Sequence, residues 1–157
     1  LRRYAPSASP ETHPRLDSLV RYAVAYFRDF VAPKKRYREA DEVERGVLAR
    51  ISSRLAEMPA GASADDIQHA LYDIARPIPR YQDFSARGAT AARPGVSNEF
   101  FNMVYAVLLG ESQGPRLGSF IAIYGLEETR SLIARALKGE LVRESRAGHV
   151  SLNAAAP

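Results

Sequence analysis

The chain has 157 residues, a net charge of +4 and a pI near 9.6, with 46% hydrophobic and 25% charged residues. These proportions are typical of a folded globular domain, and the basic balance weakly favours a polyanionic partner. The absence of cysteine excludes disulfides and thiolate metal sites, and no apolar run is long enough for a membrane helix. We therefore expect a cytoplasmic protein without membrane contact.

The first 13 residues are predicted to form a flexible linker, because they carry prolines and serines without periodicity. They include neither an initiator Met nor a signal peptide, so we expect a piece of a longer protein. A helix is expected from Pro14 to about Val31, where apolar residues recur at helical spacing. Tyr22 and Tyr26 flank this stripe, either as packing at the edge of the core or as a stacking platform for bases.

A dense basic segment follows Pro33, which ends the first helix. It holds Lys34, Lys35, Arg36 and Arg38, which surround Tyr37. Four cations within five residues are candidates for contacts with a phosphate backbone. The alternative is a solvated linker, which is what a run of charge usually is.

Two further helices are predicted between residues 40 and 77. The first begins at Ala40–Asp41 with acidic residues in its first turn, as the helix dipole favours, and ends before Pro59. The second is capped by Ser63 and ends by Arg76–Pro77. His69 lies among carboxylates there, but no second histidine stands at ligand spacing, so no metal site is predicted.

Residues 77–96 form a long connection, and such connections are usually functional or disordered. Its arginines are interleaved with aromatic residues: Arg80, Tyr81, Phe84, Arg87 and Arg93. Rings can stack on unpaired bases while arginines contact phosphates or base edges. Equally, Tyr81 and Phe84 could pin the connection to the core.

Three further helices are predicted after residue 96, and a glycine hinge joins the last two of them. Ser97 caps a helix that stops at Gly110, and Pro115 then opens a helical hairpin, residues 115–124 and 126–137, broken at Gly125. Arg116 stands at a helix start, where the dipole favours an anion, so it is either a phosphate or carboxylate site or a solvated arginine. The polar residues 142–157 are predicted to be a frayed tail.

No strand pattern is present, so the predicted fold is all-α with about five or six helices. The chain contains no Gly-x-Ser-x-Gly, phosphate-loop or His-Glu-x-x-His motif. Its three histidines fall in the linker, on a helix surface and in the tail. We therefore predict no catalytic residues, no metal and no cofactor in this chain.

Four stretches together resemble the C-terminal end of class I lysyl-tRNA synthetase. They are RDFVAPKKRYREADEVER (28–45), DDIQHALYDIARPIPRYQDF (65–84), PGVSNEFFNMVYAVLLG (94–110) and LLGESQGPRLGSFIAIYGLEETRSLIARAL (108–137). They follow the family's order and cover about Leu16–Leu137. The resemblance implies that residues 14–141 form an α-helix cage, an orthogonal bundle-like domain that binds the anticodon region of lysine tRNA.

The resemblance also implies ATP-dependent lysine activation in the intact enzyme, by a Rossmann-type domain whose His-Ile-Gly-His and Lys-Met-Ser-Lys-Ser type motifs are absent here. The fragment itself would not be an enzyme, and ATP would belong to the missing catalytic domain. Its partners would be lysine tRNA and that catalytic domain. The alternative is a helical interaction module that docks on the catalytic domain or on a partner synthetase.

We hypothesise that Arg80, Tyr81 and Arg116 lie near anticodon bases, because of their charge, their aromatic character and the helix start at Pro115. The basic residues Lys34, Lys35, Arg36 and Arg38 would lie near phosphates.

Overall fold

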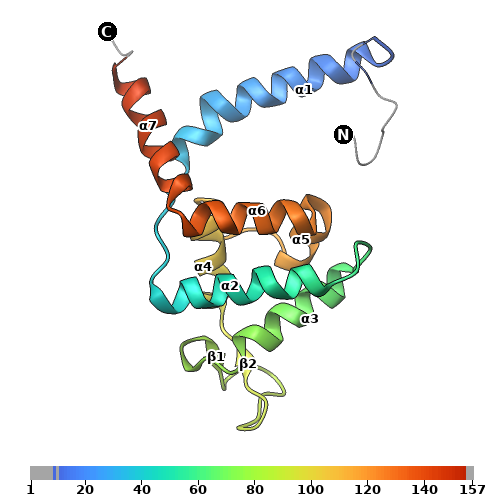
Figure 1. Ribbon diagram of the computed structural model, residues 1–157, viewed down its shortest axis with the longest axis vertical. Coiled ribbons are helices and arrows are strands. Elements are labelled where there is room, and N and C mark those ends of the chain that lie inside the picture. Colours follow the sequence, from blue (N-terminus) through green and yellow to red (C-terminus); the bar gives the residue numbers. More distant parts are fainter. Residues whose placement is uncertain (1–8, 10, 155–157) are drawn as a thin grey trace. The chain divides into compact units, whose positions relative to one another are not determined.

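The computed structural model describes residues 9 and 11–154, which contain seven α-helices and one very short two-stranded ladder (Figure 1). The predicted all-α class is confirmed. The chain divides into two compact units, residues 1–35 and 36–157. This grouping differs from the predicted division into 1–13, 14–141 and 142–157, because the first helix belongs to a unit of its own.

The first unit is built on one long helical segment. Helix α1 spans Pro14–Tyr26 and continues as a π-helical turn over Phe27–Val31 and a 3-10 turn over Ala32–Lys34. This run agrees with the helix predicted to about Val31. Helix α1 buries no residue within the part of the chain that the structure describes. Most of the predicted linker, residues 1–8 and 10, lies outside that part.

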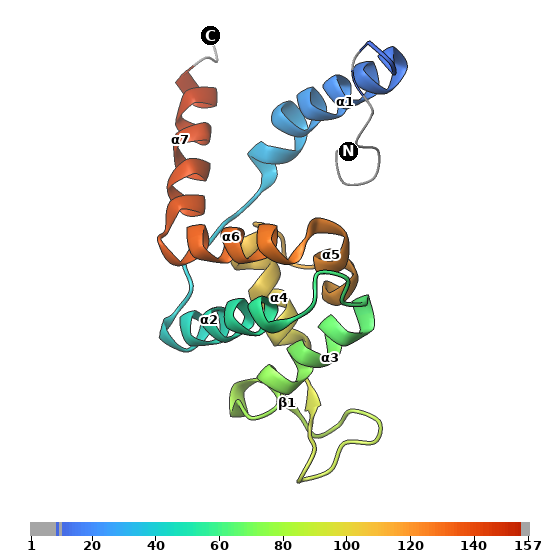
Figure 2. The same cartoon turned by 45° about the vertical axis from the view of Figure 1, so that its right-hand side comes forward.

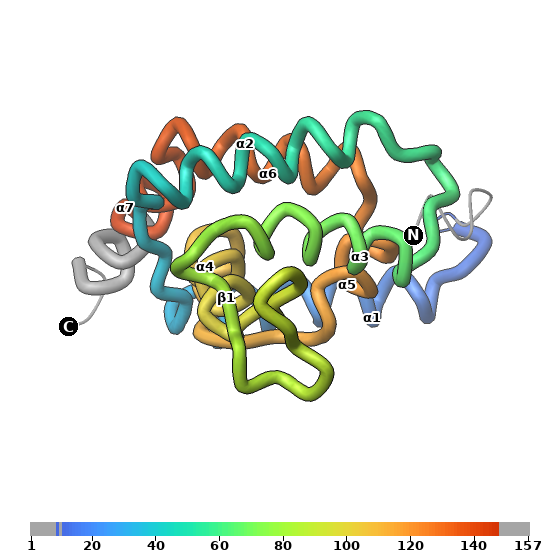
Figure 3. Tube along the Cα trace, turned by 90° about the horizontal axis from the view of Figure 1, so that it is seen from below, coloured from blue at the N-terminus to red at the C-terminus, as the bar shows by residue number. Residues whose placement is uncertain are grey.

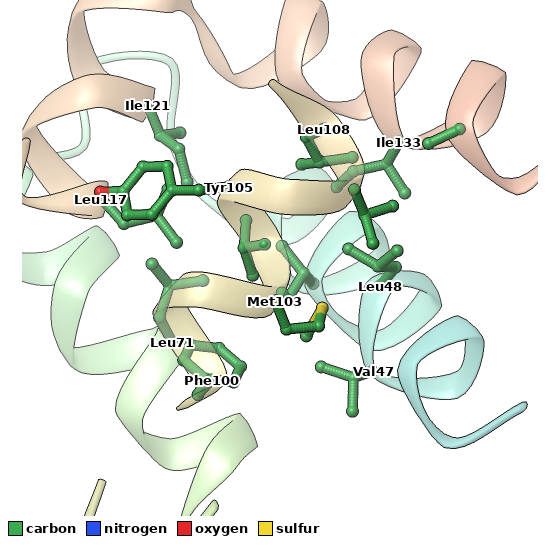
Figure 4. Close-up of a cluster of buried hydrophobic side chains, with 14 of the residues drawn as sticks. Val47, Leu48, Leu71, Phe100, Met103, Tyr105, Leu108, Leu117, Ile121 and Ile133 are labelled. Carbon is green, nitrogen blue, oxygen red and sulfur yellow. The ribbon is translucent and has the colours of Figure 1, made fainter. Parts of the chain in front are cut away.

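The second unit packs its helices in crossing pairs. They are α2 (Glu42–Glu57), α3 (Ala64–Ala75), α4 (Asn98–Leu108), α5 (Leu117–Tyr124), α6 (Leu126–Leu137) and α7 (Glu140–Ala154). Helix α2 lies beside α6, and α3 beside α5 (Figure 3). Helix α4 runs across them (Figure 2), and its side chains Phe100, Met103, Tyr105 and Leu108 occupy the centre of the core (Figure 4).

Local signals set several helix starts. Reciprocal capping boxes join Asp41 with Glu44 at α2, and Ser63 with Asp66 at α3, so the predicted cap at Ser63 is confirmed. Ser97 occupies the N-cap of α4, but its hydroxyl makes no capping hydrogen bond.

The hairpin of α5 and α6 also begins slightly later than predicted. Helix α5 starts at Leu117 with Arg116 as its N-cap, so Pro115 precedes the helix. Gly125, with φ of 117°, separates α5 from α6, as its conformational freedom predicted. A Cβ at Gly118 would lie 2.3 Å from the Ala64 carbonyl oxygen, so this glycine permits the close crossing of α5 and α3.

Two segments differ from the sequence-based predictions. Gln82–Asp83 (β1) pairs with Gly95–Val96 (β2) in an antiparallel ladder, which is too short to produce an alternating pattern. The predicted frayed tail is helical to Ala154, because α7 is held by the buried Leu141 and Val142. Residues 155–157 lie outside the described part.

Candidate nucleic-acid interface

Arg116 lies at the N-cap of α5 with its side chain 50% exposed. Its Nη1 donates to Oδ1 of Asp65 at 2.5 Å, so its partner is a carboxylate of its own chain. An exposed ion pair of this kind contributes little stability. The guanidinium can therefore exchange Asp65 for a phosphate at small cost, and the dipole of α5 favours an anion at the same end.

An open groove of about 390 Å³ adjoins Arg116, between α3, α4 and the segment that leads into α5. Its lining combines the side-chain amides of Gln68, Asn98, Asn102 and Gln113 with the rings of Tyr72, Phe101 and Tyr105. We call it the amide groove. Amides carry both a donor and an acceptor, and rings offer stacking surfaces.

Asn98 and Asn102 are two exposed amides of the groove that come from one helix. They stand four residues apart on α4, so they share one face of the helix. Both are exposed, and neither makes a side-chain hydrogen bond within the part of the chain described here. Gln68 is different, because it is buried and its Oε1 accepts from the Gly118 N–H at 2.8 Å. The groove therefore pairs free amides with one that fixes α5.

Tyr105 fixes the wall of the amide groove that precedes α5. Its hydroxyl donates to the Pro115 carbonyl, and its ring lies so close to Gly114 that a Cβ there would be 2.6 Å from Cε1. Burial raises the pKa of the Tyr105 hydroxyl. Further back along the chain, the Arg36 N–H donates to the Gly110 carbonyl at 2.8 Å. This bond joins the start of the second unit to the end of the α4 segment.

The structure separates the four predicted phosphate contacts. Lys34 and Lys35 belong to the first unit, where Lys35 Nζ lies 5.9 Å from the centroid of the Phe27 ring. Arg36 and Arg38 belong to the second unit. Arg38 is engaged internally, since its Nη1 and Nη2 donate to the two carboxylate oxygens of Glu44 at 2.6 and 2.8 Å.

Arg80 joins Arg38 in an ion-pair network that we call the Glu44 cluster (Arg38, Asp41, Glu44 and Arg80). The Glu44 side chain is 0% exposed and also accepts from the Asp41 N–H at 2.9 Å and from Arg80 Nη2 at 3.3 Å. Arg80 Nη1 donates to Asp41 Oδ2 at 2.6 Å. The cluster thus connects Arg38, the start of α2 and the start of the 77–96 connection.

The charges of the Glu44 cluster stabilise one another. Burial raises the pKa of Glu44, but the hydrogen bonds from Arg38 and from the Asp41 N–H outweigh it and hold this pKa below its ordinary value. The hydrogen bond to Asp41 raises the pKa of Arg80. The sequence interpretation treated Glu44 only as a first-turn acid. It also lies three and four residues before the buried Val47 and Leu48, which is the signal that would have placed it on the core face.

The two aromatic residues of the connection have opposite environments. Tyr81, proposed as an anticodon contact, is fully buried, with its ring 5.5 Å from Phe100 in an edge-to-face arrangement. Burial raises the pKa of its hydroxyl. Tyr81 therefore pins the connection to the core and presents no ring face for a base. Phe84 is 62% exposed, so Phe84 is the one of the two whose ring is available for stacking.

Within the described ranges, no group of three or more His, Asp or Glu side chains could hold a metal ion. No helix in that part of the chain is long and apolar enough to cross a membrane.

The chain is homologous to lysine–tRNA ligases over most of its length. The ligase of Roseobacter denitrificans is 40% identical over 144 residues, and that of Rickettsia akari is 36% identical over 146 residues. Each match covers 92% of this chain and 24% of the relative. The ligase of Rickettsia bellii is 36% identical over 137 residues. The chain therefore spans about a quarter of the length of the curated relatives it matches. No family model and no solved structure matches it.

Proposed function

We propose that this chain is the C-terminal, anticodon-binding part of a class I lysyl-tRNA synthetase. It binds the anticodon region of lysine tRNA and thereby supports ATP-dependent lysylation. Lysine activation, and the ATP it requires, belong to the catalytic domain of the intact ligase, since this chain contains no catalytic motif. The homology to lysine–tRNA ligases supports a role on tRNA in general.

The amide groove is the observation that carries the anticodon assignment. Proteins that read single-stranded RNA hydrogen-bond the edges of splayed bases and stack their faces on rings. Asn98 and Asn102 offer free amide groups, Tyr72 and Phe101 offer rings, and Arg116 offers a cation for a base edge or a phosphate. An unpaired nucleotide is a ligand that uses all three kinds of group.

The other basic residues take different roles in this proposal. Lys34, Lys35 and Arg36 contact phosphates of the anticodon arm, which adds affinity without sequence preference. Arg38 and Arg80 support the RNA interface only indirectly, because both are held by the ion pairs of the Glu44 cluster. Tyr81 is a core residue.

Binding of lysine tRNA and of a variant with an altered anticodon tests this function. Arg116→Ala and Asn102→Ala should lose most of the preference between the two RNAs, because each good base contact discriminates by about 1–3 kcal/mol. Arg54→Ala is the matched control, since Arg54 is also half exposed and paired with a carboxylate, but lies outside the groove. Equal affinity of the unaltered protein for both RNAs would refute anticodon reading.

The basic segment is tested separately through the salt dependence of binding. A Lys34→Ala/Lys35→Ala/Arg36→Ala variant should bind both tRNAs more weakly and with a flatter dependence on salt, while its anticodon preference is retained. An unchanged salt slope would remove these three residues from the interface.

One observation favours a protein-interaction module as the second candidate function. The first unit exposes six large hydrophobic side chains: Leu19, Tyr22, Val24, Tyr26, Phe27 and Phe30. A short helix without packing is marginal in water, so α1 requires a covering surface. A photo-crosslinker in place of Tyr22 in the full-length ligase should then label the catalytic domain, and absence of that product would count against docking there.

A further inference from the structure

The segment 84–93, which we call the arginine loop, is held firmly at its base. The ladder of β1 and β2 closes it, with Gln82 opposite Val96 and Asp83 opposite Gly95. Asp83 Oδ1 accepts from both the N–H and the hydroxyl of Ser85, at 2.8 and 2.6 Å. A Cβ at Gly95 would lie 2.5 Å from the Cβ of Ala86, so the first turn of the loop packs directly on its closing strand.

The tip of the arginine loop has its own hydrogen bonds. Thr90 and Arg93 exchange two backbone bonds of 3.1 Å, and the Arg93 N–H also lies 3.0 Å from Thr90 Oγ1. The Ala89 N–H donates to the Ala86 carbonyl at 2.9 Å. The loop is therefore preformed, which lowers the entropy cost of binding a ligand with it. It projects away from the helices of the second unit (Figure 2).

The side chains that the loop presents are one ring and two cations. Phe84 is 62% exposed, and Arg87 and Arg93 are exposed without an ion pair among the residues that the structure describes. No acidic residue stands between Asp83 and Glu99. The remaining positions up to Arg93 are Ser, Ala, Gly and Thr, so nothing bulky hinders an approach to the arginines.

These groups fit single-stranded RNA better than a protein surface. One isolated ring is not an apolar patch of the size that protein partners use. A ring on the same short loop as two guanidinium groups without ion pairs in the described chain matches the alternation of base and phosphate along an unstacked strand. The loop also continues into the amide groove, because β2 ends at Val96 and Asn98 of the groove follows two residues later.

We propose that the arginine loop is a second RNA contact, in which Phe84 stacks on an unpaired nucleotide and Arg87 and Arg93 bind the phosphates beside it. The proposal rests on the proposed function, since it places this nucleotide next to those bound in the amide groove. It assigns the loop the task of holding the strand where it leaves the groove.

Phe84→Ala tests the stacking contact in a binding assay with lysine tRNA. Affinity should fall roughly tenfold, because stacking of one base on a ring contributes that order of free energy. Phe84→Tyr should restore binding, since it keeps the ring. Ile123→Ala is the matched control, because Ile123 is 67% exposed but lies outside both the loop and the groove. An unchanged affinity of Phe84→Ala would overturn the stacking contact.

The phosphate contacts are tested by Arg87→Ala/Arg93→Ala. The slope of log affinity against log salt should become shallower by about 1.4, at about 0.7 for each phosphate of a single strand. Arg50→Ala/Arg54→Ala removes two exposed arginines of α2 as the control and should leave the slope as it is. If the unaltered chain binds lysine tRNA but the loop variants bind equally well with the same slope, the loop proposal fails alone. If the unaltered chain does not bind, the proposed function fails.

Discussion

Arg38 and Arg80 meet in the Glu44 cluster, whereas Arg87 and Arg93 stand on the arginine loop that follows Arg80 in the chain. All four are arginines with solvent-accessible side chains. The first two donate to a buried carboxylate and its capping partner. The second two have no carboxylate partner in the part of the chain described.

The comparison shows that the same residue type serves two purposes in one basic region. Arg38 and Arg80 use their charge to hold the chain just before α2 and the start of the 77–96 connection against α2. Arg87 and Arg93 leave their charge available to a ligand. Counting basic residues therefore overstates the surface that an RNA can use, and the partners of each guanidinium must be considered.

Among the variants that test this comparison, removal of the buried Glu44 carboxylate should have the largest effect on stability. Glu44→Gln places an amide NH₂ group against two guanidinium groups, so we expect the free energy of unfolding to fall by about 2 kcal/mol. Urea unfolding followed by circular dichroism measures this change. Glu42→Gln is the control, because Glu42 is exposed in the same helical turn, and it should change stability by no more than about 0.5 kcal/mol. Equal effects of both substitutions would mean that the Glu44 cluster is not structural.

Acid should remove the same stabilisation gradually. The pKa of Glu44 in the folded chain lies below its ordinary value of 4.5, so its carboxylate stabilises the fold above that pH. This contribution is lost as the pH falls through the lower pKa of the folded state. The stability difference between the unaltered chain and Glu44→Gln should therefore stay constant near neutral pH and narrow below 4.5. A difference that widened in acid would contradict the direction of the pKa shift.

The environments of Tyr81 and Phe84 show the limit of prediction from sequence. Both rings lie in one connection, three residues apart, and the sequence left stacking and pinning open for each. Tyr81 is buried because it packs on Phe100, nineteen residues later. Packing partners so distant leave no trace in local periodicity, whereas the capping box at Ser63 lies within four residues and was predictable.

The Glu44 cluster was missed for a similar reason. Its arginines come from positions 38 and 80, so their convergence depends on the tertiary fold. Arg116 was predicted at a helix start and lies at one, but the free amides beside it, Asn98 and Asn102, come from another helix and were not identified. The sequence thus located individual candidate residues, and the packing of α3, α4 and α5 assembled the groove around one of them.

The smallest expected effect is the difference in stability between a variant of the Glu44 cluster and a variant of the arginine loop. Arg80→Ala should lower the free energy of unfolding by at most about 1 kcal/mol, because its partly exposed pairs are screened by solvent. Arg87→Ala should leave it unchanged within about 0.5 kcal/mol, since Arg87 makes no ion pair in the described chain. Thermal or urea unfolding of the two variants under identical conditions measures the contrast. If Arg87→Ala destabilised the fold as much as Arg80→Ala, the charge of the loop would be structural and unavailable to an RNA.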